Sequence, residues 1–306
     1  MGKTIVSVLA LTAIFLTGCG AQERAEASAP PANPFCETQD ATQPVAEPQG
    51  EGQEKFDEEG IPLKYQAGQY VYNPVHIAQY ALLDRDNVML VADWLLKTQD
   101  CDTGQWFYHF DFPVGGTSVT LEAPWASAMA QGEGISVLTY AYDESGEEKY
   151  LDAAEFALEP LKVDVEEGGL KQDFFGHDFY EEYPTDPPSY TLNGFMFALL
   201  GLHDLAQASP NSDAQALYDE GLKTLIYALP FYDQGDTSAY HLGHLFDPPR
   251  KVHTSPRYHV LHVKQLKRLN EISSDPVLQY YHNLWQWYIT SDPEKWEGVG
   301  ATFVYE

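Results

Sequence analysis

Cysteine is scarce in this sequence, and motifs that bind metals or nucleotides are missing. The chain has 306 residues and three cysteines, and none of these stands at a Cys/His spacing typical of a metal site. An oxidising compartment would permit a disulfide between Cys36 and Cys101. A glycine-rich fingerprint of the GxGxxG type is also absent, so a redox route through a nicotinamide is unsupported. We therefore expect chemistry without a metal or a cofactor.

Basic residues are also few. Lys and Arg number 17 against 46 Asp and Glu, which gives a formal net charge of −29. Like charges repel, so this balance is adverse for an anionic partner. One window, residues 247–270, nevertheless holds six of the 17 bases and a single acidic residue. Its basic and imidazole side chains are Arg250, Lys251, His253, Arg257, His259, His262, Lys264, Lys267 and Arg268. Taken alone, the window fits a basic helix surface without a partner as well as a wall that binds anionic groups.

The longest apolar run at the N-terminus, residues 5–16, is too short for a permanent membrane span and is typical of a signal peptide. The Leu-Thr-Gly-Cys sequence that ends at Cys19 resembles a bacterial lipoprotein cleavage box. Residues 20–60 lack apolar clusters and are rich in Ala, Glu, Pro, Gln and Gly. We expect a signal peptide at 1–18, a lipid-anchored disordered tether at 19–60 and a folded domain at 61–306. The protein would then be anchored in a bacterial cell envelope, as a periplasmic or outer-membrane lipoprotein.

Helical periodicity dominates the expected domain. An Asn cap followed by Pro marks a helix start at 73, and 191–208 is apolar nearly all round, as in an inner helix. Strand-like segments at 104–112 and 169–175 interrupt the helices. We expect helices at 73–83, 87–98, 126–142, 148–161, 191–208, 213–228, 258–272 and 276–289. Consecutive pairs of inner and outer helices predict an all-α fold with short β excursions, an incomplete α/α toroid around a cleft.

One loop is dense in acidic and aromatic residues. Residues 177–205 read HDFYEEYPTDPPSYTLNGFMFALLGLHDL, in which Tyr180, Glu181, Glu182 and Tyr183 precede a turn with three prolines. Proline cannot continue a helix and restricts the residue before it. The cluster therefore lies on a stiff loop that leads into an apolar helix, and such a loop is a candidate place for chemistry on a sugar.

Four more segments occur with this loop in a fixed order. They read PWASAMAQGE (124–133), LNGFM (192–196), PFYDQG (230–235) and RYHVLHVKQL (257–266). The set resembles the catalytic part of the D-glucuronyl C5-epimerases, which invert C5 of glucuronate in heparosan. The resemblance runs from about Asn73 to Tyr288. It implies an α/α-toroid fold, an isomerase activity and an anionic uronate polysaccharide as partner.

The resemblance also implies site residues. The catalytic Glu-Tyr of the family falls on Glu182 and Tyr183, and its two further tyrosines fall on Tyr240 and Tyr258. Around these we expect substrate contacts from the matching segments, the acidic loop and the basic window. These are Trp125, Gln131, Tyr180, Glu181, Asn193, His244, Arg257, His259 and His262.

Epimerisation at C5 requires two acid/base groups on opposite faces of the sugar and something that neutralises the carboxylate. Glu182 is a natural carboxylate for one face and a tyrosine for the other. A tyrosine that acts as a base needs positive charge nearby to lower its pKa. Arg257 and His259 flank Tyr258 in the sequence and are candidates for this charge.

Three other functions remain open. A uronate lyase abstracts the same C5 proton and then expels the group at C4. A glycosidase could use Asp178, Glu181 and Glu182 as acid and nucleophile or base. A glycan-binding lipoprotein without catalysis would need the aromatic residues and no working acid/base pair.

Overall fold

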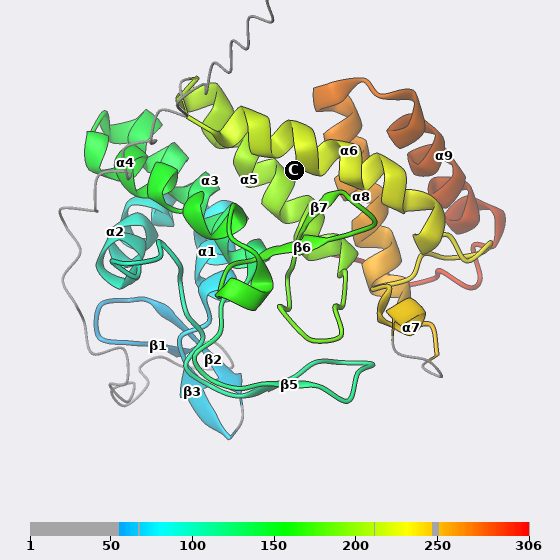
Figure 1. Cartoon of the computed structure of the whole chain (residues 1–306), viewed down its shortest axis with the longest axis horizontal. Coiled ribbons are helices and arrows are strands. Elements are labelled where there is room, and N and C mark those ends of the chain that lie inside the picture. The colour runs from blue at the N-terminus through cyan, green and yellow to red at the C-terminus, as the bar shows by residue number, and fades with distance from the viewer. Residues whose placement is uncertain (1–54, 67, 211, 247–250, 306) are drawn as a thin grey trace, which may run out of the picture. The chain divides into compact units, whose positions relative to one another are not determined.

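The computed structural model describes residues 55–66, 68–210, 212–246 and 251–305. This part of the chain is mainly helical, as predicted (Figure 1). The predictions for the signal peptide, for Cys19 and for most of the tether lie outside the described residues. Cys101 is disulfide-bonded, and Cys36, with which an oxidising compartment would permit a disulfide, also lies outside them. No helix of the described segments combines the length and the apolar character needed to cross a membrane.

Eight long helices form four consecutive pairs among the described residues. Within each pair the first helix is inner and the second outer, and the inner helices α1, α3, α5 and α8 are neighbours in that order. The pairs are α1 (Pro74–Leu83) with α2 (Val88–Thr98), α3 (Ala128–Ser145) with α4 (Glu148–Phe156), α5 (Leu192–Ala208) with α6 (Ala214–Tyr232), and α8 (Pro256–Ser273) with α9 (Pro276–Ser291). This is the arrangement expected for an incomplete toroid.

The inner helices α3 and α5 make the most extensive contact of the fold. Their backbones meet at two glycines, because a Cβ on Gly132 would collide with Ala198 and a Cβ on Gly201 would collide with the carbonyl of Gly132. Helix α5 is buried along nearly its whole length, from Leu192 to Ala206. A sequence that is apolar all round therefore forms the centre of the helical layer, as its composition predicted.

The connections that enter the inner helices carry the strands. A three-stranded antiparallel sheet, β1 (Lys55–Phe56), β2 (Pro62–Gln66) and β3 (Gln69–Val71), precedes α1. Two hairpins follow, β4 (Phe112–Pro113) with β5 (Thr120–Leu121) before α3, and β6 (Lys171–Asp173) with β7 (Asp178–Tyr180) before α5. The short helix α7 (Gly243–Phe246) precedes α8, and 3-10 turns cover Arg85–Asn87, Glu159–Leu161 and Val165–Glu167. Figure 1 shows most of these connections along the lower side of the helices.

Three expected boundaries need correction. Residues 55–60, assigned to the tether, belong to the fold because β1 pairs with β2 and Asp57 accepts hydrogen bonds from the backbone of Ile61 and the hydroxyl of Tyr72. The segment 104–112 forms an isolated bridge at Tyr108 in place of a strand. Helix α6 continues to Tyr232 and contains Pro230 in its last turn.

Candidate active site

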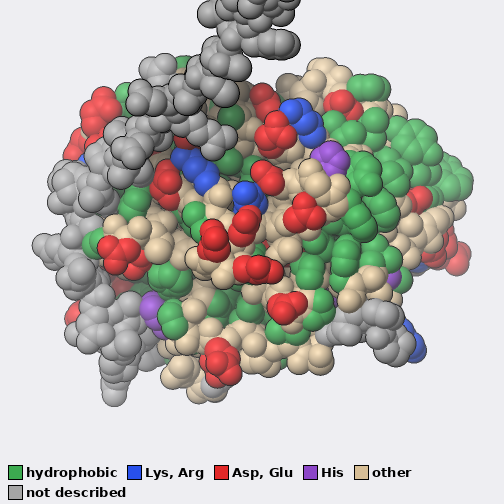
Figure 2. Space-filling model, in the orientation of Figure 1, with side chains coloured by type: hydrophobic (Ala, Val, Ile, Leu, Met, Phe, Trp, Pro, Cys, Tyr) green, Lys and Arg blue, Asp and Glu red, His purple; other side chains and the backbone are tan. Residues whose placement is uncertain are grey.

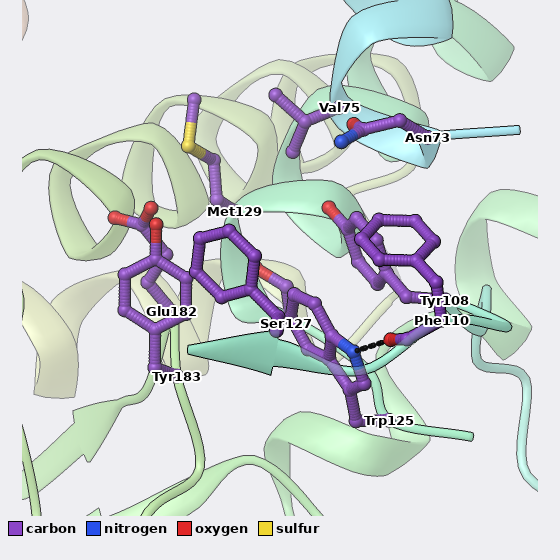
Figure 3. Close-up of a pocket in the computed structure, with 10 residues that line it drawn as sticks. Asn73, Val75, Tyr108, Phe110, Trp125, Ser127, Met129, Glu182 and Tyr183 are labelled. Carbon is purple, nitrogen blue, oxygen red and sulfur yellow. Dashed lines mark hydrogen bonds between the residues drawn. The ribbon is translucent and has the colours of Figure 1, made fainter. Parts of the chain in front are cut away.

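A small cavity lies where the inner helices begin. It has a volume of about 100 Å³ and is closed at one end by the Glu182 carboxylate and the Tyr183 ring (Figure 3). Asn73 and Val75 come from the start of α1, Ser127 and Met129 from the start of α3. The other lining residues are aromatic, namely Tyr108, Phe110, Phe112 and Trp125. The cavity therefore has polar groups at the helix starts and an aromatic wall opposite them.

The aromatic wall is a continuous stack. The ring of Trp125 lies 3.9 Å from that of Tyr108 at an interplanar angle of 6°. Phe112 stacks on Trp125 at 5.6 Å and on Tyr183 at 5.4 Å. The indole Nε1 of Trp125 donates a hydrogen bond of 2.9 Å to the carbonyl of Phe110, which fixes the ring. Aromatic side chains suit the apolar face of a sugar, and Trp125, predicted as a substrate contact, lines the cavity as a member of this stack.

The Glu182 side chain packs against Gly194 in the first turn of α5. A Cβ on Gly194 would collide with the Glu182 side chain, so only glycine leaves room for the carboxylate at this position. Glu182 is 5% exposed, and burial raises its pKa to about 7. Tyr183, Asn193, Tyr240 and the backbone of Gly194 oppose this shift, yet Oε2 has no hydrogen-bond partner among the described residues. A buried carboxylate with a free oxygen and a pKa near neutrality is well suited to accept a proton.

Three tyrosine side chains lie in a row beside the Glu182 carboxylate. The hydroxyls of Tyr183 and Tyr240 lie 3.3 Å apart, and the rings of Tyr240 and Tyr258 lie 4.3 Å apart. Burial and the Glu182 carboxylate raise the pKa of all three, while Arg257 acts on Tyr258 in the opposite direction. The four residues predicted as catalytic, which come from three separate segments, are thus brought together by the fold.

Asn193 also reaches this group. It is the second residue of α5 and is 2% exposed, and its Oδ1 has no partner among the described residues. Its Nδ2 lies 3.8 Å from the sulfur of Met129, a cavity residue, and Gln265 Nε2 donates to the backbone carbonyl of Asn193. An unpartnered, buried amide oxygen is costly unless a ligand donates a hydrogen bond to it.

The N-termini of the inner helices lie beside the site residues. The first turns of α1, α3, α5 and α8 carry the residues Val75, Met129, Asn193 and Tyr258. The N-terminus of a helix bears a partial positive charge and free N–H groups, which favour an anion. Among the described residues that line the cavity there is no Lys or Arg. The face shown in Figure 2 likewise carries more acidic than basic side chains.

Two predicted contacts on the acidic loop belong to the scaffold. The Glu181 carboxylate accepts hydrogen bonds from Ser189 Oγ at 2.9 Å and from the Tyr190 N–H at 2.9 Å, and the residue is fully buried. The Tyr180 hydroxyl donates to the carbonyl of Leu217 on α6. Neither side chain lines the cavity, so we reassign both to structural roles.

Gln131 is a third correction. Its Oε1 accepts a hydrogen bond of 3.1 Å from the Trp106 N–H, and its Nε2 donates to the carbonyls of Gly104 and Ala157. The side chain is fully buried. With the amide occupied by backbone groups, Gln131 has no hydrogen bond left for a sugar. It ties the loop before α3 to the end of α4.

His259 and His262 are buried on α8, where both rings pack against Trp285 of α9, and they do not contribute charge. Ser238 Oγ lies 2.9 Å from Nδ1 of His259 and 2.8 Å from Nδ1 of His262. His259 Nε2 lies 3.1 Å from the carbonyl of Trp285, so this nitrogen carries the proton. Burial lowers the pKa of His259 to about 4 and that of His262 as well. Both are neutral at pH 7, which contradicts the expected positive charge of His259 beside Tyr258.

The remaining predicted contacts lie at the rim. Arg257 is exposed on the first turn of α8, next to Tyr258. His244 is half-buried in α7, and its Nδ1 has no partner among the described residues. Burial lowers the pKa of His244. Neither residue lines the cavity, so each stays a prediction for a longer ligand.

Sequence reasoning missed Glu133. This residue on α3 is fully buried, accepts a hydrogen bond of 2.9 Å from Gln79 Nε2, and has an Oε2 without a partner in the described part of the chain. Burial raises its pKa well above the ordinary value, and the charge of Glu182 acts in the same direction. The residue lies one turn after the cavity residue Met129, a spacing present in the segment 124–133 that could have indicated it.

Comparison with known protein families identifies the family of this chain. The model of the D-glucuronyl C5-epimerase C-terminus matches residues 99–287. The chain belongs to this family. The resemblance drawn from the sequence segments is therefore confirmed, and the matched range contains Glu182, Tyr183, Tyr240 and Tyr258.

Two curated relatives extend the comparison. The D-glucuronyl C5-epimerase of Caenorhabditis elegans is 39% identical over 211 residues, which cover 63% of this chain and 33% of the relative. An uncharacterized protein of Methanocaldococcus jannaschii is 32% identical over 213 residues, 65% of each chain. The chain thus spans about a third of one relative and 65% of the other. Among solved structures, the unsaturated glucuronyl hydrolase of Bacillus sp. GL1 aligns with a TM-score of 0.44 and 13% identity, over 74% of this chain and 63% of that one.

Proposed function

We propose that this protein is an epimerase that inverts C5 of glucuronate to give iduronate in a heparosan-like polysaccharide. The observation that carries the proposal is the buried Glu182 carboxylate, which has a free oxygen and faces a row of three tyrosine hydroxyls. Membership of the C5-epimerase family supports the reaction class. The aromatic wall beside this row supports a sugar as the ligand.

The proposed reaction moves only protons. C5 is α to a carboxylate, and Glu182 removes its proton while negative charge develops on the carboxylate oxygens. Tyr258 then donates a proton to the opposite face of C5. A pKa of about 7 keeps Glu182 a useful base at neutral pH. The raised pKa of Tyr258 keeps its hydroxyl protonated until carbon takes the proton.

The developing charge needs stabilisation, and the described residues of the lining include no Lys or Arg. We assign the uronate carboxylate to the hydroxyls of Tyr183 and Tyr240. The first turns of the inner helices add partial positive charge at fixed positions. Donors that are oriented before the substrate arrives lose no energy to reorganisation during the reaction. No step in this scheme requires a cofactor.

The test is proton NMR of heparosan incubated with the protein in heavy water. We expect loss of the C5 proton signal of glucuronate and the appearance of iduronate, without added metal or nucleotide. Absorbance of an unsaturated uronate would instead identify a lyase. A polymer that binds without exchange at C5 would identify a glycan-binding protein. Loss of activity after removal of a bound metal or nucleotide would contradict the scheme above.

A glycosidase finds less support in the geometry. That reaction needs two carboxyl groups on either side of the scissile bond. Glu181 is engaged with Ser189 and Tyr190, and Asp178 is exposed on β7. Among the described residues, Glu182 is the one carboxylate that lines the cavity.

We also propose that Cys19 is lipidated and that the segment after it anchors the protein to a membrane of the cell envelope. The support is the apolar run and the Leu-Thr-Gly-Cys sequence before it. Cys19→Ala should move the protein from the membrane fraction to the soluble fraction. An unchanged distribution would exclude the anchor. Deletion of residues 20–50 in the Cys19→Ala variant stops before β1 and should leave epimerase activity in the soluble fraction.

A further inference from the structure

The cavity beside Glu182 has a second polar region, to which Asn73, Tyr108 and Ser127 contribute. Asn73 precedes α1 and Ser127 precedes α3. Figure 3 shows Asn73 and Tyr108 at the end of the cavity away from the Glu182 carboxylate. The proton transfers at C5 use none of these three side chains, so their polar groups are left for another part of the ligand.

Asn73 caps α1 and presents a donor to the cavity. Its Oδ1 accepts a hydrogen bond of 2.9 Å from the His76 N–H. The cap therefore identifies the other atom of the amide as Nδ2, which can only donate. Because Asn73 lines the cavity while its oxygen is engaged in the cap, the group that it offers to a ligand is an N–H.

Ser127 occupies the corresponding position before α3 but does not cap that helix. Serine is a preferred N-cap residue, whose hydroxyl usually accepts a hydrogen bond from the first turn. The backbone of Ser127 is extended as a cap requires, yet its side chain makes no cap hydrogen bond. The residue is 1% exposed and lines the cavity. Its buried hydroxyl is therefore not used by the helix and faces the ligand space.

The Tyr108 hydroxyl lies between the two helix starts. Burial raises the pKa of this hydroxyl and the charge of Glu182 raises it further, so Tyr108 stays protonated. The Val75 N–H and the Ser127 hydroxyl act in the opposite direction, which places both beside the Tyr108 oxygen. A hydroxyl whose oxygen receives such donors has its own proton to give. This region of the cavity thus presents hydrogen-bond donors to a ligand.

The group that fits is small and uncharged, with an acceptor oxygen and an apolar part. The described lining residues include no Lys or Arg and the chain has a net charge of −29, so a second anion near Glu182 is disfavoured. A cavity of about 100 Å³ is far below the roughly 300–1,000 Å³ that enclose a drug-sized ligand, so it takes one substituent of a polymer. The rings of Phe110 and Trp125 line the same cavity and offer an apolar contact.

We propose that Asn73, Tyr108 and Ser127 form a subsite for the acetamido group of the amino sugar next to the uronate. The proposal rests on the proposed function, because heparosan alternates uronate with an N-acetylated amino sugar. The acetamido carbonyl accepts from the donors of the subsite, and its methyl group packs on the aromatic wall. The subsite sets the register of the polymer, so that a uronate and not an amino sugar lies beside Glu182.

The test compares the wild type with Asn73→Asp on two probes, heparosan and N-deacetylated heparosan, in which an ammonium replaces each acetamido group. Aspartate also caps a helix, so the melting temperature should be kept. The substitution replaces a donor by an acceptor that repels a carbonyl and attracts an ammonium. We expect Kd and KM for heparosan to rise about tenfold, with kcat changed by less than about threefold. The ratio of the two Kd values should shift at least about tenfold toward the N-deacetylated probe.

The matched control is Asn87→Asp, which adds the same charge at the N-cap of α2, outside the described residues that line the cavity. This variant should leave the ratio of the two Kd values unchanged. Ser127→Ala removes a hydroxyl that α3 does not use, and it should raise Kd for heparosan about threefold without loss of stability.

The subsite and the epimerase function can fail separately. An unchanged Kd ratio in Asn73→Asp, or a loss confined to kcat, would overturn the subsite, and C5 exchange by the wild type would still support the epimerase. Heparosan binding that depends on Asn73 without C5 exchange would remove the epimerase function and leave the subsite. A protein that binds neither probe would contradict both.

Discussion

Glu181 and Glu182 are neighbours in the chain, are identical in chemistry and are both buried, but their surroundings differ. The Glu181 carboxylate is saturated by Ser189 and by the backbone of Tyr190. Glu182 has an oxygen without a partner and lies against the cavity. Burial raises the pKa of Glu181 to about 8 and that of Glu182 to about 7. A raised pKa alone therefore does not separate a structural carboxyl from a reactive one; the free oxygen does.

The difference follows from where each side chain points. Glu181 turns under the Pro-rich loop and holds residues 189 and 190 in place before α5 begins. Glu182 points toward Gly194 in the first turn of α5, where any residue with a Cβ would collide with the Glu182 side chain. One residue fixes the loop, and the other uses the position that the loop provides.

The largest expected effect is on Glu182. Glu182→Gln keeps the shape and removes the base, so epimerisation should fall by about 10²–10⁴-fold. Thermal unfolding should change little, because an uncharged amide is easily tolerated in this buried site. The measurement is C5 deuterium exchange on glucuronate units beside a melting curve. Tyr218→Phe is the control, since that buried hydroxyl has no partner among the described residues. Near-normal epimerisation would remove Glu182 from its assigned role.

Gly194→Ala should give the next largest loss. The added methyl collides with the Glu182 side chain and displaces the carboxylate. A displacement of this kind lowers activity by about 10²-fold. Gly221→Ala collides with Leu199 and Tyr180 instead. That variant should lose stability while its folded fraction keeps activity. The comparison uses specific activity per folded molecule, and equal losses in both variants would show that Gly194 has only a packing role.

Glu181→Ala should act on stability. It leaves the Tyr190 N–H without its buried acceptor, and such a loss costs about 1–3 kcal/mol, while the Ser189 hydroxyl keeps its contacts with Tyr183 and Thr191. Chemical denaturation measures the free energy of unfolding. Activity should decline only as far as the folded fraction does. A stable variant without activity would mean that Glu181 takes part in the reaction.

The smallest effect concerns the pH dependence of stability. The folded protein holds a proton on Glu181 up to about pH 8, whereas the ordinary value is 4.5. Between these values the folded state binds more protons than the unfolded chain, so stability falls as pH rises. Glu181→Gln should flatten this slope by about 1 kcal/mol per pH unit. Unfolding measured at pH 5, 6 and 7 gives the slope, and an unchanged slope would refute the assignment of the proton.

The helical architecture was predictable because it depends on local patterns. Asn73 caps α1 by accepting a hydrogen bond from the His76 N–H, as the Asn-Pro pair predicted. Helix α5 is buried all round, as its composition required. The sheet at residues 55–71 was missed because its strands are short and polar, and its stability comes from long-range pairing and from Asp57.

The site was predictable in its members more than in its details. Glu182, Tyr183, Tyr240 and Tyr258 were found through the family resemblance, and the fold brings them together. Residue type could not distinguish Glu181 from Glu182. His259 is hydrogen-bonded to Ser238 and Trp285, which come from segments far away in the chain. Burial and hydrogen bonding of this kind are set by tertiary contacts, which no local pattern contains.

The first turns around the cavity are spread along the chain, from Val75 on α1 to Tyr258 on α8. A chain emerging from the ribosome acquires them in that order. Glu182 and its glycine are present well before the last tyrosine is synthesised. The α8–α9 pair therefore supplies the proposed acid, and a chain truncated before this pair carries Glu182 without it.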